Sequence, residues 1–473
     1  MPEQHAKDAH VDLDTSDSID PQAKDVALGK LMRDHVTRLE AFRKVGELGA
    51  ELEADDNPVE RALSALPQFA DATKREGFER AMSAFGEMLL GAATTADAPQ
   101  TSEDAEVDGA TGHELNPGSD LVHLNVRRDE SGAFRGASLR IDDPDVNHVF
   151  GELVLEVATA ASGPKRRDIV RASLLTTIVS AFEVLVGDLA AIYFRAHPGA
   201  LGASPEFSLS DLALFDTVDD ARDELIARRV DALDRDLETL PKWLKARMDI
   251  DLRRLALEWG EFVEITQRRH LVVHTGGRVT RRYLANVSSR YAAPVGEVLV
   301  VDADYLNDAI DHFVAIGTSL VFAVWFVLGD DPASAGSNML SSMRRLARAG
   351  RWRVVCSLAD VAARLEGPED LMLHFRVLGW LASSRLNGRS AVEPAVRSWD
   401  VSALAKEWHL ARLCLLNQTA EAAEIAAELI AGNELPAVAI LIDPLYEGLR
   451  DTPQVSSAIR DRGIAYPGEP STG

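Results

Sequence analysis

Arginine and histidine side chains gather in one short stretch of the chain, "QRRHLVVHTGG", from Gln267 to Gly277. An imidazole has an ordinary pKa near ~6.5, so it can take or give a proton at neutral pH. A guanidinium can hold a phosphate through two hydrogen bonds and stabilise added negative charge. Arg269, His270 and His274 therefore have the side chains that proton transfer at a phosphate requires.

The same region reverses the charge of the chain. Between Ile265 and Gly296 there is no Asp or Glu, although the chain has 75 acidic and 50 basic residues and a net charge of -25. This acid-free window contains Arg268, Arg269, Arg278, Arg281, Arg282 and Arg290. The acidic surface disfavours general attraction to nucleic acid, so a phosphate backbone would bind only at a local basic patch. Basic residues at a helix end that interact favourably with the negative end of the helix dipole would explain one or two of these arginines but not six.

A metal site is the alternative use of the histidines, because His270 and His274 have the four-residue spacing of zinc ligands on a helix. The glutamate of an HExxH motif is missing and no third ligand is obvious. Neither Cys356 nor Cys414 belongs to a CxxC motif, which fits a reducing cytoplasm. We expect no metal, no cofactor and a cytoplasmic protein, since "MPEQHAKDAH" has no apolar core of a secretory signal.

The elements that position these residues are predicted to be mainly helices. One helix should run from Pro241 to His274 and end at Gly276 and Gly277. Its packing face would carry Leu255, Trp259, Phe262, Thr266 and Val273, with Arg269 and His270 beside it. Further helices are predicted over 165–196, 218–237 and 308–328, and a β-hairpin over 121–141. The apolar stretch from Phe313 to Gly329 is shorter than a spanning helix, so we expect a core or subunit-interface helix and no membrane.

The domain organisation follows from changes in composition along the chain. We predict a disordered tail over 1–25, a helical region over 26–92, an acidic linker over 93–120, and a domain over 121–329 whose helical bundle spans 147–329. Residues 333–473 contain short amphipathic segments separated at Gly350, Gly367, Gly388, Asn417 and Gly432. There "LARAGRW" and "ARLCLLNQTAEAAEIAAELI" resemble tetratricopeptide helices, which predicts a helical-repeat array that binds a protein partner.

The segment "RHLVVH", from Arg269 to His274, matches the R-x4-H signature of HEPN-domain proteins, with the polar His270 after the arginine. Upstream, "LLTTIVSAFEVLVGDL" is similar to the first long helix of that family, where an acid often follows an aromatic residue, here Glu183 after Phe182. The resemblance covers about a third of the chain, from Arg167 to Leu328. It implies a mainly α protein with a HEPN-like bundle that dimerises and brings two motifs into one cleft.

Many HEPN members are metal-independent endoribonucleases, so the resemblance implies attack by a ribose 2′-oxygen that leaves a 2′,3′-cyclic phosphate. His274 would be the base or acid, Arg269 the phosphate clamp, His270 an orienting or proton-transferring residue, and Glu183 a residue that fixes Arg269 or a histidine. The RNA-binding residues would be Arg268, Arg278, Arg281 and Arg282. Some toxin members carry a modified tyrosine two positions after the histidine, where this chain has Gly276. A defence or toxin-like role is expected; the rival hypotheses are a non-catalytic dimeric scaffold and an RNA-binding sensor.

Overall fold

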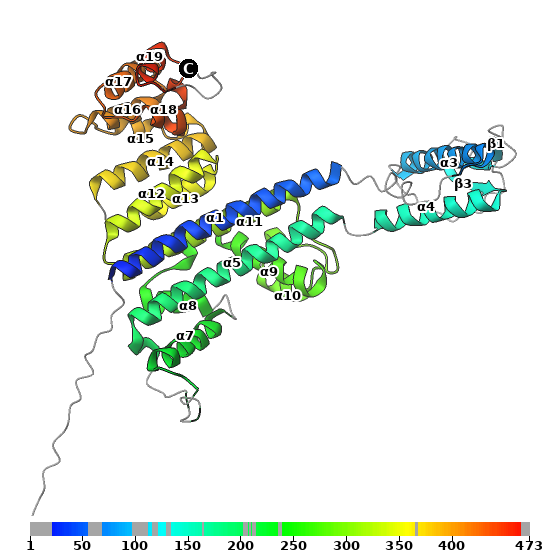
Figure 1. Ribbon diagram of the computed structural model, residues 1–473, viewed down its shortest axis with the longest axis horizontal. Coiled ribbons are helices and arrows are strands. Elements are labelled where there is room, and N and C mark those ends of the chain that lie inside the picture. Colours follow the sequence, from blue (N-terminus) through cyan, green and yellow to red (C-terminus); the bar gives the residue numbers. More distant parts are fainter. Residues whose placement is uncertain are drawn as a thin grey trace, which may run out of the picture. The chain divides into compact units, whose positions relative to one another are not determined.

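The structure of the protein is a computed structural model. It describes residues 21–54, 69–96, 112–115, 122–128, 134–162, 165–201, 207, 210, 214–234, 239–364 and 368–464. These residues are mainly helical, as predicted (Figure 1). The chain divides into two units, one formed by Met1–Glu47 with Val170–Gly473 and the other by Leu48–Ile169.

The smaller unit contains a small antiparallel sheet between two helices. Its elements are α3 (Ala72–Ala96), β1 (Gly112–Leu115), β2 (Val122–Arg128), β3 (Phe134–Ile141) and α4 (Pro144–Ser162). The strand order is β1-β2-β3, and the pairing of β2 with β3 confirms the predicted hairpin. Two expectations differ: β1 lies inside the predicted linker 93–120, and the hairpin packs with α3 and α4 rather than with the later helices. Its apolar face is covered locally, because Ala81, Val122 and Phe150 form a core of their own.

The larger unit is built on long helices that pack side by side. These are α1 (Pro21–Ala54), α5 (Arg166–Ala196), α9 (Trp259–Thr275) and α11 (Ala303–Leu328). Helix α1 runs antiparallel to α11: Trp325 Nε1 donates to Asp25 at 2.6 Å, and His35 Nε2 lies 2.8 Å from the carbonyl oxygen of Phe313. Helix α1 therefore begins inside the predicted tail 1–25 and joins the bundle up to Glu47, whereas the prediction placed it in a separate region 26–92.

An aromatic cluster joins the three helices that surround the R-x4-H segment. The rings of Phe182 on α5, Phe262 on α9 and Phe313 on α11 contact one another with centroids 5.3 to 5.6 Å apart. By length and composition alone, α5 and α11 are each long and apolar enough to cross a membrane. In α11, 78% of the most apolar window is buried inside the protein, so packing within the bundle accounts for its apolar side chains.

The helix predicted over Pro241–His274 is three elements. They are α8 (Thr239–Met248), η2 (Leu252–Arg254) and α9. The break lies at Asp249, which has a φ of 56°, a left-handed conformation that a continuing helix does not contain. Helical structure resumes after this break, since the side chain of Asp251 caps η2 and that of Glu258 caps α9. The remaining elements that the structure describes before α11 are η1 (Pro198–Leu201), α7 (Val218–Asp234), α10 (Arg281–Asn286) and η3 (Ser289–Tyr291).

The chain after α11 forms a run of shorter helices, which we call the C-terminal helices. They are α12 (Pro332–Arg348), α13 (Trp352–Ala362), α14 (Glu369–Asn387), η4 (Arg389–Ala391), α15 (Glu393–Ser398), α16 (Lys406–Leu416), α17 (Thr419–Ala431), α18 (Ala437–Ile442), η5 (Pro444–Leu449) and α19 (Pro453–Asp461). Gly350, Gly388 and Asn417 lie at the predicted turns and have positive φ, whereas Gly367 is outside the described residues. The helices α12 to α14 share the hydrophobic core of the bundle.

Candidate functional site

Helix α9 carries the R-x4-H segment and is capped at both ends. At its start, the carboxylate of Glu258 accepts hydrogen bonds from the backbone N–H groups of Gly260 and Glu261, at 2.8 and 2.7 Å. At its end, Gly276 has a φ of 60° and its N–H donates to the carbonyl of Leu271. A glycine adopts this left-handed cap at no steric cost, so the sequence stops the helix two residues after His274.

The packing face of α9 differs in part from the predicted stripe. Phe262 and Thr266 are buried as expected, and Leu255 is buried just before the helix. Val273 is 49% exposed, because the last turn of α9 extends past the core and Leu271 makes the buried contact there instead. The end of the helix that carries the histidines is therefore at the surface.

The structure brings Arg269 and Glu183 together from α9 and α5. Nη2 of Arg269 donates to Oε2 of Glu183 at 3.3 Å, and the two side chains are 26% and 27% exposed. Of the two partners predicted for Glu183, Arg269 or a histidine, the structure shows Arg269. Nε of Arg269 is buried and has no hydrogen-bond partner among the described residues. The guanidinium is thus oriented by one carboxylate and keeps a donor that no described group uses.

His270 and His274 lie on successive turns with their ring centroids 4.3 Å apart. His270 is half-buried and His274 is exposed. Burial lowers the pKa of His270 below its usual value, and the positive charges of His274, Arg282 and Arg269 lower it further. The two rings are therefore close enough to share proton transfer to one bound group, with His270 favoured in its neutral form at pH 7.

The other predicted RNA-binding arginines have three different surroundings. Arg281 and Arg282 are exposed at the start of α10, and the effect of Arg282 on His270 places it near the imidazole pair. Arg278 is exposed and its Nη1 donates to the carbonyl of Gly296 at 3.3 Å. These three leave charged groups at the surface beside the end of α9.

Arg268 does not fit its predicted role and is removed from the candidate site. Its Nε donates to Oε1 of Glu264 at 2.7 Å, and its guanidinium lies 4.0 Å from the ring centre of Tyr305. Only 14% of the side chain is exposed. Arg290 is also paired, since its Nη2 donates to Glu261 at 2.8 Å. The acid-free window thus overstates the free positive charge, because acids outside it neutralise arginines inside it.

Sequence reasoning missed two polar clusters along one side of α9. Glu264 is 1% exposed and also accepts hydrogen bonds from the hydroxyls of Tyr283 and Tyr305, both at 2.7 Å. Glu261 lies 2.5 Å from Nε2 of the buried His312. The i, i+3, i+6 spacing of Glu258, Glu261 and Glu264 was the available signal, since residues three apart share a helix face.

The described part of the chain contains no group of three or more His, Cys, Asp or Glu side chains placed to hold a metal ion. No protein-family model matches the chain, and neither a curated protein nor a solved structure matches it. The candidate site is therefore defined by its own geometry: an arginine held by a carboxylate, beside two histidines at the surface end of a capped helix.

Proposed function

We propose that the protein is a metal-independent endoribonuclease of HEPN type, with Arg269, His270 and His274 as catalytic residues and Glu183 as the residue that orients Arg269. The observation that carries the proposal is the oriented guanidinium beside two imidazoles 4.3 Å apart. Cleavage through a ribose 2′-hydroxyl is accelerated by one base, one acid and a cation that stabilises charge on the phosphate between them.

The proposed reaction assigns one step to each side chain. Neutral His270 or His274 removes the proton from the 2′-hydroxyl, the 2′-oxygen bonds to phosphorus, and the bond from phosphorus to the 5′-oxygen breaks. The other histidine donates a proton to that 5′-oxygen, which leaves a 2′,3′-cyclic phosphate on one product. Burial lowers the pKa of His270, which favours its neutral form and suits it to act as the base. Arg269 neutralises charge on the non-bridging oxygens, and Arg278, Arg281 and Arg282 bind phosphates of neighbouring nucleotides.

The test is cleavage of end-labelled RNA in excess EDTA by the wild type and by Arg269→Ala, His270→Ala and His274→Ala. Matched controls are His148→Ala, an exposed histidine in the smaller unit, and Arg222→Ala, a half-buried arginine paired with Asp219. Cleavage by the wild type and both controls, with a loss of at least about a hundredfold in the three site variants, supports the proposal. Equal cleavage by His274→Ala and the wild type rules out the assignment.

We also propose that the protein forms a homodimer through the bundle. A groove of ≈ 360 Å³ lies between α1 and α5, beside the exposed Val184, which is 54% exposed and next to Glu183 in the chain. A second copy that covers this groove would bury Val184 together with charged groove residues such as Asp188 and Arg195. Light scattering of the wild type and of Val184→Asp tests this proposal. We expect the wild type to be a dimer and the variant to be a monomer. A monomeric wild type would contradict the proposal.

The C-terminal helices support the second part of the proposal, a helical-repeat array that binds a protein partner. Alternate helices α12, α14 and α16, with the segment around α18, line a pocket of ≈ 350 Å³. Arg344 and Arg348 lie at its α12 side, and Ile442 is 48% exposed at the other side. If the site variants change no activity while the dimer persists, the scaffold function becomes the better proposal. RNA binding without cleavage would favour the sensor.

A further inference from the structure

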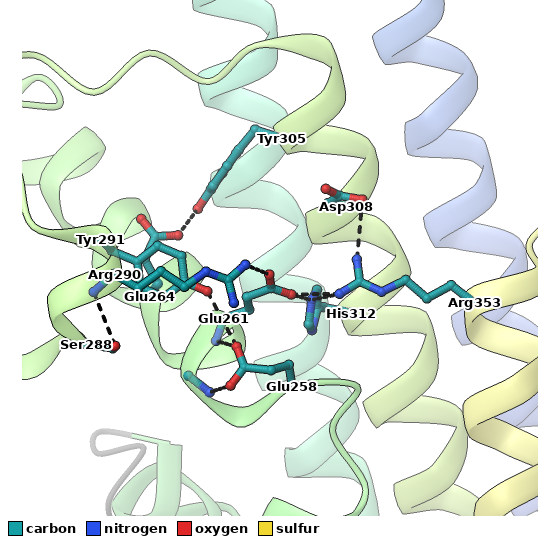
Figure 2. A network of polar contacts seen from close by, with 11 residues as sticks. Glu258, Glu261, Glu264, Ser288, Arg290, Tyr291, Tyr305, Asp308, His312 and Arg353 are labelled. Carbon is teal, nitrogen blue, oxygen red and sulfur yellow. Dashed lines mark hydrogen bonds and ion pairs between the residues drawn. The ribbon is translucent and has the colours of Figure 1, made fainter. Parts of the chain in front are cut away.

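The first turn of α9 carries Glu261, whose carboxylate contacts two arginine side chains and one histidine side chain. Oε2 of Glu261 lies 2.5 Å from Nε2 of His312 and 2.8 Å from Nη2 of Arg353, and Oε1 lies 2.8 Å from Nη2 of Arg290 (Figure 2). The carboxylate is only 19% exposed. Hydrogen bonds and ion pairs of a half-buried carboxylate fix its direction more firmly than those at an open surface.

These partners come from different parts of the chain. His312 lies on α11 and is 1% exposed, whereas Arg353 is the second residue of α13 and belongs to the C-terminal helices. Nη1 of Arg353 also lies 3.5 Å from Oδ1 of Asp308 on α11, as Figure 2 shows. One guanidinium of the C-terminal helices therefore links the carboxylates of α9 and α11.

Helix α9 connects this link to the candidate active site without a break. Glu261 precedes Arg269 by eight residues, which is about 12 Å along one regular helix. A short helix moves as a rigid rod, so a change of direction at its first turn displaces the side chains at its last turn. A misplacement of about 1 Å at a reacting group lowers a rate by about a hundredfold.

We propose that Arg353 and Glu261 are positioning residues of the proposed ribonuclease, and that Arg353 makes the geometry at Arg269, His270 and His274 depend on the C-terminal helices. This inference rests on the proposed function. Arg353 can be removed without leaving a buried charge unpaired, because Glu261 keeps His312 and Arg290, and Asp308 is 66% exposed to water. The fold therefore survives the substitution while the direction of α9 loses one of its restraints.

The experiment compares RNA cleavage kinetics of the wild type, Arg353→Gln, Arg353→Lys and Glu261→Gln. Arg353→Gln is expected to lower kcat by about tenfold to a hundredfold with KM changed less than about threefold, because the substrate contacts remain. Arg353→Lys keeps the charge beside Glu261 and should restore most of kcat. If Arg353 acts through Glu261, the double variant with Arg353→Gln and Glu261→Gln should have the same kcat as Glu261→Gln alone. The matched control is Arg397→Gln, because among the described residues Arg397 forms its ion pair with Glu393, and both residues lie in α15.

A second measurement separates this inference from the proposed function. Amide hydrogen exchange over residues 262–275 should be faster in Arg353→Gln than in the wild type and unchanged in Arg397→Gln. If the wild type cleaves RNA and Arg353→Gln has the same kcat, the positioning role is overturned. If the wild type cleaves nothing, the nuclease proposal fails, and unchanged exchange over α9 then overturns the positioning role as well.

Discussion

Replacing Glu264 by glutamine tests whether the hydrogen bonds of the buried polar cluster beside α9 stabilise the fold. The carboxylate is 1% exposed and accepts three hydrogen bonds of 2.7 Å, from Arg268, Tyr283 and Tyr305. Burial and the charge of Glu264 raise the pKa of both tyrosines, so both hydroxyls remain donors at neutral pH. A glutamine has one acceptor oxygen and turns an N–H group toward a donor.

The expected cost follows from what Glu264→Gln leaves behind. The guanidinium of Arg268 is 14% exposed and would lose its only described carboxylate, and at least one hydroxyl would lose its acceptor. Breaking a buried ion pair at one partner costs about 3 to 5 kcal/mol, which lowers the folded-to-unfolded ratio at least a hundredfold. The matched control Glu393→Gln removes a surface pair with Arg397 and should cost about 0 to 1 kcal/mol.

Urea unfolding followed by circular dichroism measures both changes, and hydrogen exchange over residues 262–275 locates them. Glu264→Gln should lower the midpoint clearly and speed exchange in α9, whereas Glu393→Gln should do neither. Equal midpoints for the two variants would refute the claim that Glu264 is buried and triply bonded.

Three other changes give distinct results. Gly317→Ala should lower the free energy of unfolding in urea by about 1 to 3 kcal/mol, because the new Cβ would lie 2.1 Å from Nε2 of His35. Gly86→Ala is the control, because its Cβ would have nothing within 4 Å. Equal effects of the two substitutions would contradict the close packing at Gly317. Burial lowers the pKa of His35 to about 4. Between about pH 6.5 and 4 the folded state therefore binds fewer protons than the unfolded state, and the free energy of unfolding should fall by about 3 kcal/mol as the pH falls through that window. In His35→Gln this part of the pH dependence should vanish, and a wild-type slope in the variant would exclude His35 as its source. Arg281→Ala and Arg282→Ala should each weaken RNA binding without sequence preference and reduce the salt slope by about 0.7; an unchanged slope would remove that arginine from the interface.

Local rules predicted the elements that local residues determine. The long α5 and the end of α9 at Gly276 and Gly277 agree with the structure, because a helix-breaking pair or a left-handed glycine cap needs no distant partner. The break before α9 was missed because Asp249 adopts a left-handed conformation that an apolar pattern does not indicate. The hairpin over 121–141 was found from its alternation, but its association with α3 and α4 depends on contacts distant in the chain.

The candidate site was predicted only as far as spacing along α9 allows. Arg269, His270 and His274 share one helix end because they are close in sequence. The resemblance of the segment around Phe182 and Glu183 to the first HEPN helix suggested a contact of Glu183 with Arg269 or a histidine, and the structure has the first of these. The burial and pairing of Arg268 could not be predicted in this way, because they depend on Tyr305, which is 37 positions away, and on the buried Glu264. The contact of Arg353 with Glu261 could not be predicted from the sequence, since it forms where α13 packs on α11 beside α9.

The most direct test of the nuclease proposal is the cleavage of one labelled RNA in excess EDTA, beside the same strand with 2′-O-methyl sugars. We predict that the purified protein cleaves the RNA, leaves 2′,3′-cyclic phosphate ends and spares the methylated strand, because the 2′-hydroxyl is the nucleophile. Intact RNA, or equal cleavage of the methylated strand, would contradict the assignment of Arg269, His270 and His274 to this chemistry.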